Sequence, residues 1–150
     1  MSSRSEVIGR LNADMQVLIA DAVLRNERIA RTLGLNVVDL QAFGVLARAG
    51  HPLTAGELSQ RTELPSSTTT RVIDRLEKQG LVTRVSDPAD RRRVVVQVDE
   101  EQLARISSPV EGSPYAEVSA HMERVHAGFA LEELEVVARY FAALNAPTAD

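Results

Sequence analysis

Two polar segments near the middle of the chain carry side chains suited to binding a polyanion. The first is Ser66–Arg71, a run of hydroxyl side chains that ends in an arginine. The second is Arg91–Arg93, three consecutive arginines preceded by Asp90. Hydroxyl groups hydrogen-bond to base edges and phosphates, and guanidinium groups bind guanine and phosphate. Both segments point to nucleic-acid binding, provided that the fold brings them to one surface.

The first segment is typical of a helix start, where small side chains allow close approach to the major groove and the helix dipole favours phosphate. Arg71 is placed to contact guanine, and Arg75, one turn later, to touch phosphate or to pair with a nearby acid. The alternative for the hydroxyl groups is that they only cap the helix.

The second segment lies in the polar stretch 86–93, which is expected to form the tip of a hairpin. Arginines on such a tip can enter a minor groove, and Asp90 is expected to hold the shape of the tip by pairing with a neighbouring arginine. The alternative is that these arginines only keep a loop soluble. Arg84 is a further phosphate candidate. The predicted DNA-binding residues are Ser66, Ser67, Thr68, Thr69, Thr70, Arg71, Arg75, Arg84, Arg91, Arg92 and Arg93.

The elements that must position these residues follow from periodicity. Apolar residues recur at steps of three and four in residues 7–31 and 38–49, which predicts two amphipathic helices. Thr54 and Glu57 have the spacing of a capping box that opens a short helix. Another helix is expected from Ser66 or Ser67 to Gln79, with Gly80 as its stop. Two short helices across a tight turn form a helix-turn-helix.

After Gly80 the helical period changes to the alternation of a strand. Residues 81–85 and 94–98 are expected to pair as a hairpin, and a hairpin directly after a helix-turn-helix makes a winged helix. Further helices are predicted over 100–106, from about 115 to 129 and over 131–144, with a break at Ser107–Pro114. The expected fold is mainly α with a small β-hairpin wing (α+β), a winged helix-turn-helix flanked by long N- and C-terminal helices.

Composition narrows the function classes. The chain has no cysteine, which excludes a disulfide framework and a thiolate nucleophile, and no apolar run approaches the roughly 20 residues of a membrane span. The three histidines lack companion acids at metal-ligand spacing, so we expect no metal, no cofactor and no enzyme. The first ten residues lack a signal-peptide core, which makes the cytoplasm the expected location.

The net charge of −4 conceals an uneven distribution. Residues 54–98 carry seven arginines and Lys78 against six acids, whereas residues 99–150 carry three arginines against ten acids. A basic middle segment can face a polyanion while the acidic end points away.

The central segment resembles the MarR family of bacterial regulators. The residues that carry the resemblance are Ser67–Val82 and the run Asp87–Arg93, in which Asp90 and Arg92 match the Asp-x-Arg of the family's wing. The resemblance favours Arg92 as the minor-groove residue. Val98-Asp99, where the family commonly has Leu-Thr, is a departure from the pattern.

The resemblance implies a homodimer that binds a pseudo-palindromic double-stranded DNA operator, commonly as a repressor, and that is released by a small, often aromatic, effector. The terminal helices independently favour a dimer, because a lone amphipathic helix needs a surface to cover. The alternative is that both helices fold back on the module as a monomer. The expected parts are a dimerisation helix in 1–35, the DNA-binding domain in 36–99 and dimerisation helices in 100–150.

A rival hypothesis is a winged-helix protein-interaction module that acts through its acidic C-terminal helices without sequence-specific DNA binding. The serine- and threonine-rich helix beside three arginines argues against it, because a module that binds only protein does not need such a surface. The operator sequence, the effector and its pocket, and the sign of regulation do not follow from the residues.

Overall fold

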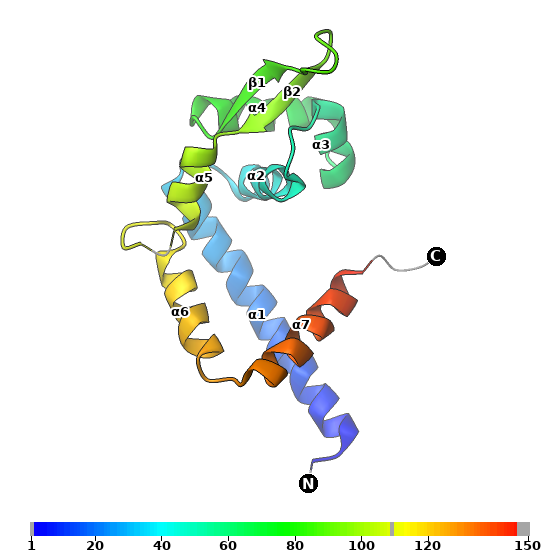
Figure 1. Cartoon of the computed structure of the whole chain (residues 1–150), viewed down its shortest axis with the longest axis vertical. Coiled ribbons are helices and arrows are strands. Elements are labelled where there is room, and N and C mark those ends of the chain that lie inside the picture. The colour runs from blue at the N-terminus through cyan, green and yellow to red at the C-terminus, as the bar shows by residue number, and fades with distance from the viewer. Residues whose placement is uncertain (1, 109, 147–150) are drawn as a thin grey trace. The chain divides into compact units, whose positions relative to one another are not determined.

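The computed structural model describes residues 2–108 and 110–146 of the chain (Figure 1). It is mainly helical with one small hairpin, which confirms the predicted fold class. The chain divides into two compact units, residues 1–105 and 106–150, and each is described here by itself. The elements are α1 (Arg4–Thr32), α2 (Val37–Ala49), α3 (Ala55–Thr62), α4 (Ser66–Lys78), β1 (Val82–Ser86), β2 (Val94–Val98), α5 (Glu100–Ser107), α6 (Ala116–His126) and α7 (Leu131–Asn145).

Reciprocal capping boxes fix the starts of α2 and α3. At α3, the Glu57 amide donates to Thr54 Oγ1 at 3.2 Å and the Thr54 amide donates to Glu57 Oε2 at 2.7 Å, as the sequence predicted. At α2, the Asp39 amide donates to Asn36 Oδ1 at 2.9 Å and the Asn36 amide donates to Asp39 Oδ2 at 3.2 Å. Each box satisfies two amides that a helix start leaves without partners.

The core of the first unit lies between α2, α3, α4 and the hairpin. The predicted inward residues of α4, namely Val72, Ile73 and Leu76, are each at most 1% exposed. They pack in a core to which the other elements contribute Leu40, Phe43, Leu46, Leu53, Leu58, Val82, Val95 and Val96. Burial of these apolar side chains holds α4 and the hairpin as one module.

A glycine ends α4 and turns the chain into the hairpin. Gly80 has a φ of 71°, a left-handed conformation that favours glycine, and the Leu81 amide donates to the Leu76 carbonyl at 3.0 Å. Strands β1 and β2 then pair antiparallel, with Val82 opposite Val98 at one end and Ser86 opposite Val94 at the other.

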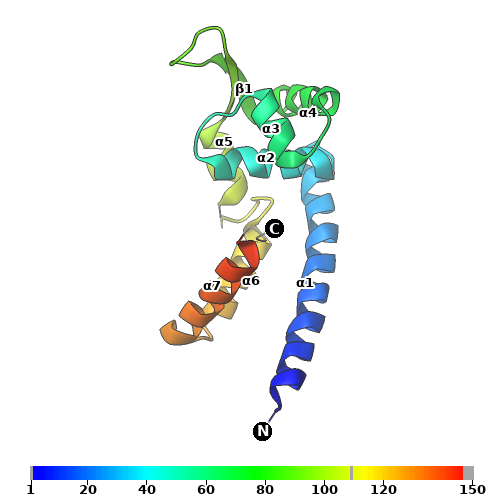
Figure 2. The ribbon, with the colours of Figure 1, turned by 90° about the vertical axis from the view of Figure 1, so that its right-hand side faces the viewer.

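Helix α1 belongs to the first unit but buries little of its apolar stripe. Among its residues only Ile29 and Ala30, near its C-terminal end, are buried. The apolar residues further toward its N-terminus are exposed, among them Ile8, Leu11, Leu18, Ile19 and Val23. Figures 1 and 2 show α1 extending away from the module as a single long helix.

The second unit contains α6 and α7, neither of which has a buried residue. The predicted break before α6 is present: α5 ends at Ser107 and α6 begins at Ala116. The Ser113 hydroxyl donates to the Ile106 carbonyl at 2.6 Å and so stabilises the turn between these helices. The exposed large apolar residues of α7 are Leu131, Val136, Val137, Tyr140, Phe141 and Leu144.

Within residues 2–108 and 110–146, no single helix is long and apolar enough to cross a membrane. Helices α1 and α2 satisfy the criteria of length and composition only as a pair, which is bent by 92°. Helix α2 supplies buried side chains to the core of the module.

Candidate nucleic-acid interface

The first turn of α4 presents hydroxyl groups of which some have no hydrogen-bond partner among the described residues. The N-cap is Pro65, and no side chain caps the helix. Ser66 and Ser67 are exposed and Thr68 is half-buried. Within the described part of the chain, none of these three hydroxyl groups makes a hydrogen bond. Capping, the alternative to DNA contact, is therefore not what Ser66 and Ser67 do here.

Thr69 does not belong to this surface, which corrects the prediction for this residue. Its side chain is fully buried, and its hydroxyl donates to the Pro65 carbonyl at 3.1 Å. Because successive residues on a helix are separated by about 100°, a run of five hydroxyl residues cannot face outward throughout. Thr70 is exposed, although its hydroxyl donates to the Ser66 carbonyl at 3.0 Å.

Arg71 is exposed and, in the described chain, pairs with no carboxylate. Arg75 differs: its Nε lies 3.0 and 2.9 Å from the two carboxylate oxygens of Asp39, and its Nη2 lies 2.7 Å from Oδ1. Asp39 is completely buried. The hydrogen bonds to Asp39 raise the pKa of Arg75 against the opposing effect of burial. Of the two predicted roles of Arg75, the structure contains the pairing with an acid.

Arg84, on β1, is held by two acids of α4. Its guanidinium pairs with Asp74 and Glu77, and its amide donates to Glu77 Oε1 at 3.1 Å. Burial lowers the pKa of Arg84, but hydrogen bonds to these two carboxylates outweigh it, so that the net direction is upward. Arg84 thus ties the hairpin to α4, and its charge is already compensated within the protein.

The tip of the wing is shaped by two aspartates. Asp87 Oδ1 accepts the Ala89 amide at 2.9 Å, and Asp90 Oδ1 accepts the Arg92 amide at 3.0 Å. The Asp90 carbonyl also accepts the Arg93 amide at 2.8 Å. Asp90 therefore holds the tip through backbone amides, rather than through the ion pair with an arginine that the sequence suggested.

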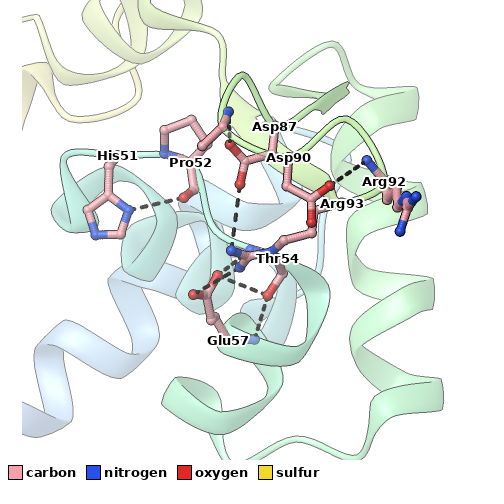
Figure 3. Close-up of polar contacts among 9 residues, drawn as sticks. His51, Pro52, Thr54, Glu57, Asp87, Asp90, Arg92 and Arg93 are labelled. Atoms are coloured by element: carbon pink, nitrogen blue, oxygen red, sulfur yellow. Dashed lines mark hydrogen bonds and ion pairs between the residues drawn. The ribbon is translucent and has the colours of Figure 1, made fainter.

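The three wing arginines separate into two groups. Arg91 and Arg92 are exposed and have no carboxylate partner among the described residues. The guanidinium of Arg93 instead lies 3.6 Å from a carboxylate oxygen of Glu57 and 3.6 Å from one of Asp87. In Figure 3 the side chain of Arg92 extends away from these acids.

The two elements that carry the unpaired groups, α4 and the hairpin, lie at one end of the module (Figures 1 and 2). In both views of the ribbon, α4 and the hairpin occupy the end away from the N-terminus of α1 (Figures 1 and 2). The exposed candidates from α4 are Ser66, Ser67, Thr70 and Arg71, and those from the wing are Arg91 and Arg92. This arrangement offers hydroxyl groups and guanidinium groups that form no ion pair among the described residues, which suits a polyanion.

Sequence reasoning missed two acids that organise this surface. The position of Asp39, three residues after Asn36, indicated only a capping box. Its ion pair with Arg75 joins residues 36 positions apart in the chain. Glu57 was recognised as a cap, but not as the partner of Arg93. Local spacing predicts a cap, whereas neither long-range partner follows from it.

The described residues contain no group of three or more His, Asp or Glu side chains that could hold a metal ion. His51 instead lies with Nδ1 3.0 Å from the Pro52 carbonyl.

The architecture is shared with known proteins. A family model described as the MarR family matches residues 33–93. Over 95 residues the chain is 43% identical to the uncharacterized HTH-type transcriptional regulator YcgE of Bacillus subtilis (strain 168), and the match covers 63% of this chain and 61% of that relative. The structure of a MarR family protein from Bacillus stearothermophilus is 26% identical with a TM-score of 0.67, covering 95% of this chain and 96% of that one.

The MarR repressor of Listeria monocytogenes shares the fold at 18% identity, with a TM-score of 0.57 over 96% of this chain and 95% of that one. Helix-turn-helix, hairpin and terminal helices define the class: a winged helix-turn-helix protein with helical extensions. The resemblance found in the central segment is confirmed: residues 33–93 match the MarR family.

Proposed function

We propose that this protein is a transcriptional regulator that binds double-stranded DNA through α4 and the wing. The N-terminal part of α4 enters the major groove, where Ser66, Ser67 and Arg71 meet base edges and phosphates. Arg92 enters the adjacent minor groove, with Arg91 beside it. The observation that carries this proposal is the difference in pairing: Arg71, Arg91 and Arg92 form no ion pair among the described residues, whereas Arg75 and Arg84 pair with acids of the same chain.

The regulator acts as a homodimer built from its terminal helices. Helix α1 exposes an apolar stripe, and α6 and α7 bury no residue within one chain. A second copy related by a twofold axis would cover these faces and would present two α4 helices to half-sites about 34 Å apart. The operator is then pseudo-palindromic.

Similarity to the MarR family supports three finer statements. The protein acts in the cytoplasm, represses its target and is released by a small aromatic effector. The alternative of a protein-interaction module is less well supported, because it gives no role to the unpaired hydroxyl groups and arginines.

Selection of bound duplexes from a random pool, at low and at moderate salt, tests this function. The expected result is enrichment of inverted repeats whose centres lie about one helical turn apart, with affinity that falls steeply as salt rises. Recovery of no enriched sequence at either salt concentration would contradict the proposal.

A further inference from the structure

Arg93 occupies a different place in the wing from its two neighbours. The Asp87 amide donates to the Arg93 carbonyl at 2.9 Å. This bond extends the hydrogen-bond ladder between β1 and β2 by one residue beyond the pair Ser86 and Val94. Arg93 is therefore the last ladder residue at the base of the tip, whereas Arg92 lies in the tip itself.

The side chain of Arg93 connects two elements. One guanidinium nitrogen lies 3.6 Å from Glu57 Oε1 at the start of α3, and the other lies 3.6 Å from Asp87 Oδ2 at the end of β1 (Figure 3). We call Glu57, Asp87 and Arg93 the wing-base network. It joins the hairpin to the helix-turn-helix at a point where the hairpin leaves the core.

Glu57 is positioned by contacts that do not involve Arg93. Leu53 pairs with Val96 of β2 through backbone hydrogen bonds of 3.2 and 2.7 Å, which brings the start of α3 alongside the hairpin. The Thr54 amide and hydroxyl donate to Glu57 Oε2 at 2.7 and 2.9 Å, so Oε1 remains for Arg93. These bonds to Thr54, followed by the charge of Arg93, lower the pKa of Glu57 despite the opposing effect of burial.

We propose that Arg93 is a positioning residue, which acts with Glu57 and Asp87 to set the direction in which the wing presents Arg91 and Arg92 to DNA. This inference rests on the proposed function. A two-stranded hairpin is marginally stable by itself, so contacts at its base determine how far its tip can swing. Holding the tip in its bound direction reduces the ordering cost of association.

The proposal makes a prediction whose sign is opposite to that of simple electrostatics. Removing a negative charge from a DNA-binding module should tighten binding, because it reduces repulsion from phosphate. Glu57→Gln keeps an oxygen for the capping box but removes the attraction to Arg93, so the wing-base network predicts weaker binding. Glu63→Gln is the matched control: it removes an exposed charge from the adjoining turn, and Glu63 makes no ion pair among the described residues.

The experiment measures binding of the full-length variants to the selected duplex by fluorescence anisotropy. Glu57→Gln and Arg93→Ala are each expected to weaken binding about two- to fivefold, the range of an exposed ion pair. The double variant should bind no more weakly than the worse single variant, because both remove the same interaction. Glu63→Gln should bind equally well or more tightly. The salt slope of Arg93→Ala should equal that of the wild type, because Arg93 touches no phosphate.

Two binding results would overturn the proposal. One is Glu57→Gln binding as tightly as Glu63→Gln; the other is a salt slope for Arg93→Ala reduced by about 0.9, the value for one lost phosphate contact. Backbone NMR relaxation without DNA separates this proposal from the proposed function. Residues 88–92 should become more mobile in Glu57→Gln and Arg93→Ala but not in Glu63→Gln, whether or not the wild type binds a duplex. Unchanged mobility in both variants would also overturn it.

Discussion

The arginines of the winged helix differ in how much of their charge is free to meet DNA. Arg75 and Arg84 already contact carboxylates, and binding a phosphate would require them to share or lose those partners. Arg71, Arg91 and Arg92 have no such partner within the described residues. A free guanidinium gains the full benefit of counterion release from DNA, whereas a paired one gains less. The number of arginines in the segment is therefore a poor guide to the number of DNA contacts.

Arg92→Ala should weaken binding to the selected duplex by about 1–3 kcal/mol, the usual effect of losing a base contact. Arg28→Ala, which removes an exposed arginine from α1, should change binding little. Both affinities can be measured by fluorescence anisotropy, with circular dichroism to verify folding. Equal affinities of the two variants would show that Arg92 does not enter the groove.

Asp39 and Arg75 should matter for stability more than for recognition. Asp39 is completely buried and serves both the Asn36 amide and the Arg75 guanidinium. Asp39→Asn leaves that guanidinium without its charged partner, which should reduce the free energy of unfolding by about 1–3 kcal/mol. Urea denaturation measures this loss. Asp21→Asn, on the exposed surface of α1, should have a free energy of unfolding within about 0.5 kcal/mol of the wild-type value. Equal stability of the two variants would show that the pair of Asp39 and Arg75 does not stabilise the fold.

At the scale of elements, polar contacts with three neighbouring segments hold the hairpin in place. Arg84 joins β1 to α4, Leu53 pairs with Val96 of β2, and the wing-base network joins both strands to α3. The hairpin is therefore part of the helix-turn-helix module, although only two strands form its sheet.

The capping box of α3 should respond to acid. The hydrogen bonds from Thr54 are the main cause that lowers the pKa of Glu57 in the folded chain, so its stabilising contribution is present above the unfolded pKa and is lost as pH falls through the folded pKa. An NMR titration of the Glu57 carboxyl carbon should give a midpoint below the ordinary value of 4.5, with the Thr54 amide shift following the same curve. A midpoint at or above 4.5 would contradict the geometry of the box.

The sequence predicted the helices and strands well but did not predict which charged side chains pair, and the difference has a physical reason. Helix and strand periods, the Thr54–Glu57 box and the Gly80 stop depend on neighbouring residues, and the structure contains all of them. The pairing of Arg75 with Asp39 and of Arg93 with Glu57 depends on how α2, α3, α4 and the hairpin pack together, so spacing along the chain carries no signal for it. Thr69 illustrates the same limit: its hydroxyl faces inward because of helix phase, which depends on where α4 begins.

At the scale of the whole molecule, the exposed apolar faces of the terminal helices need a partner. Exposed large apolar side chains on these helices are the reason for proposing a dimer, because apolar patches commonly mark protein–protein contacts. The acidic residues are concentrated in residues 99–150, whereas Arg71, Arg91 and Arg92 lie outside that stretch.

Leu18→Glu should shift the protein from dimer to monomer, because it introduces a charge into the exposed apolar stripe of α1. Gln16→Glu adds the same charge at an exposed position of α1 that is already polar and should leave the dimer intact. Analytical ultracentrifugation over a range of protein concentrations distinguishes the two. A wild-type protein that remains monomeric at every concentration would contradict the dimer itself.

The central claim is that the first turn of α4 and the tip of the wing bind the same stretch of duplex. The absence of cysteine allows it to be tested with single-cysteine variants, Ser67→Cys and Ala89→Cys, each carrying a photo-crosslinker, with Asp21→Cys as the control. Both variants should crosslink within one half-site of the selected duplex, Ser67→Cys to major-groove bases and Ala89→Cys to the flanking minor groove, while the control should not. Crosslinking from only one of the two positions, or from neither above the control, would contradict the account.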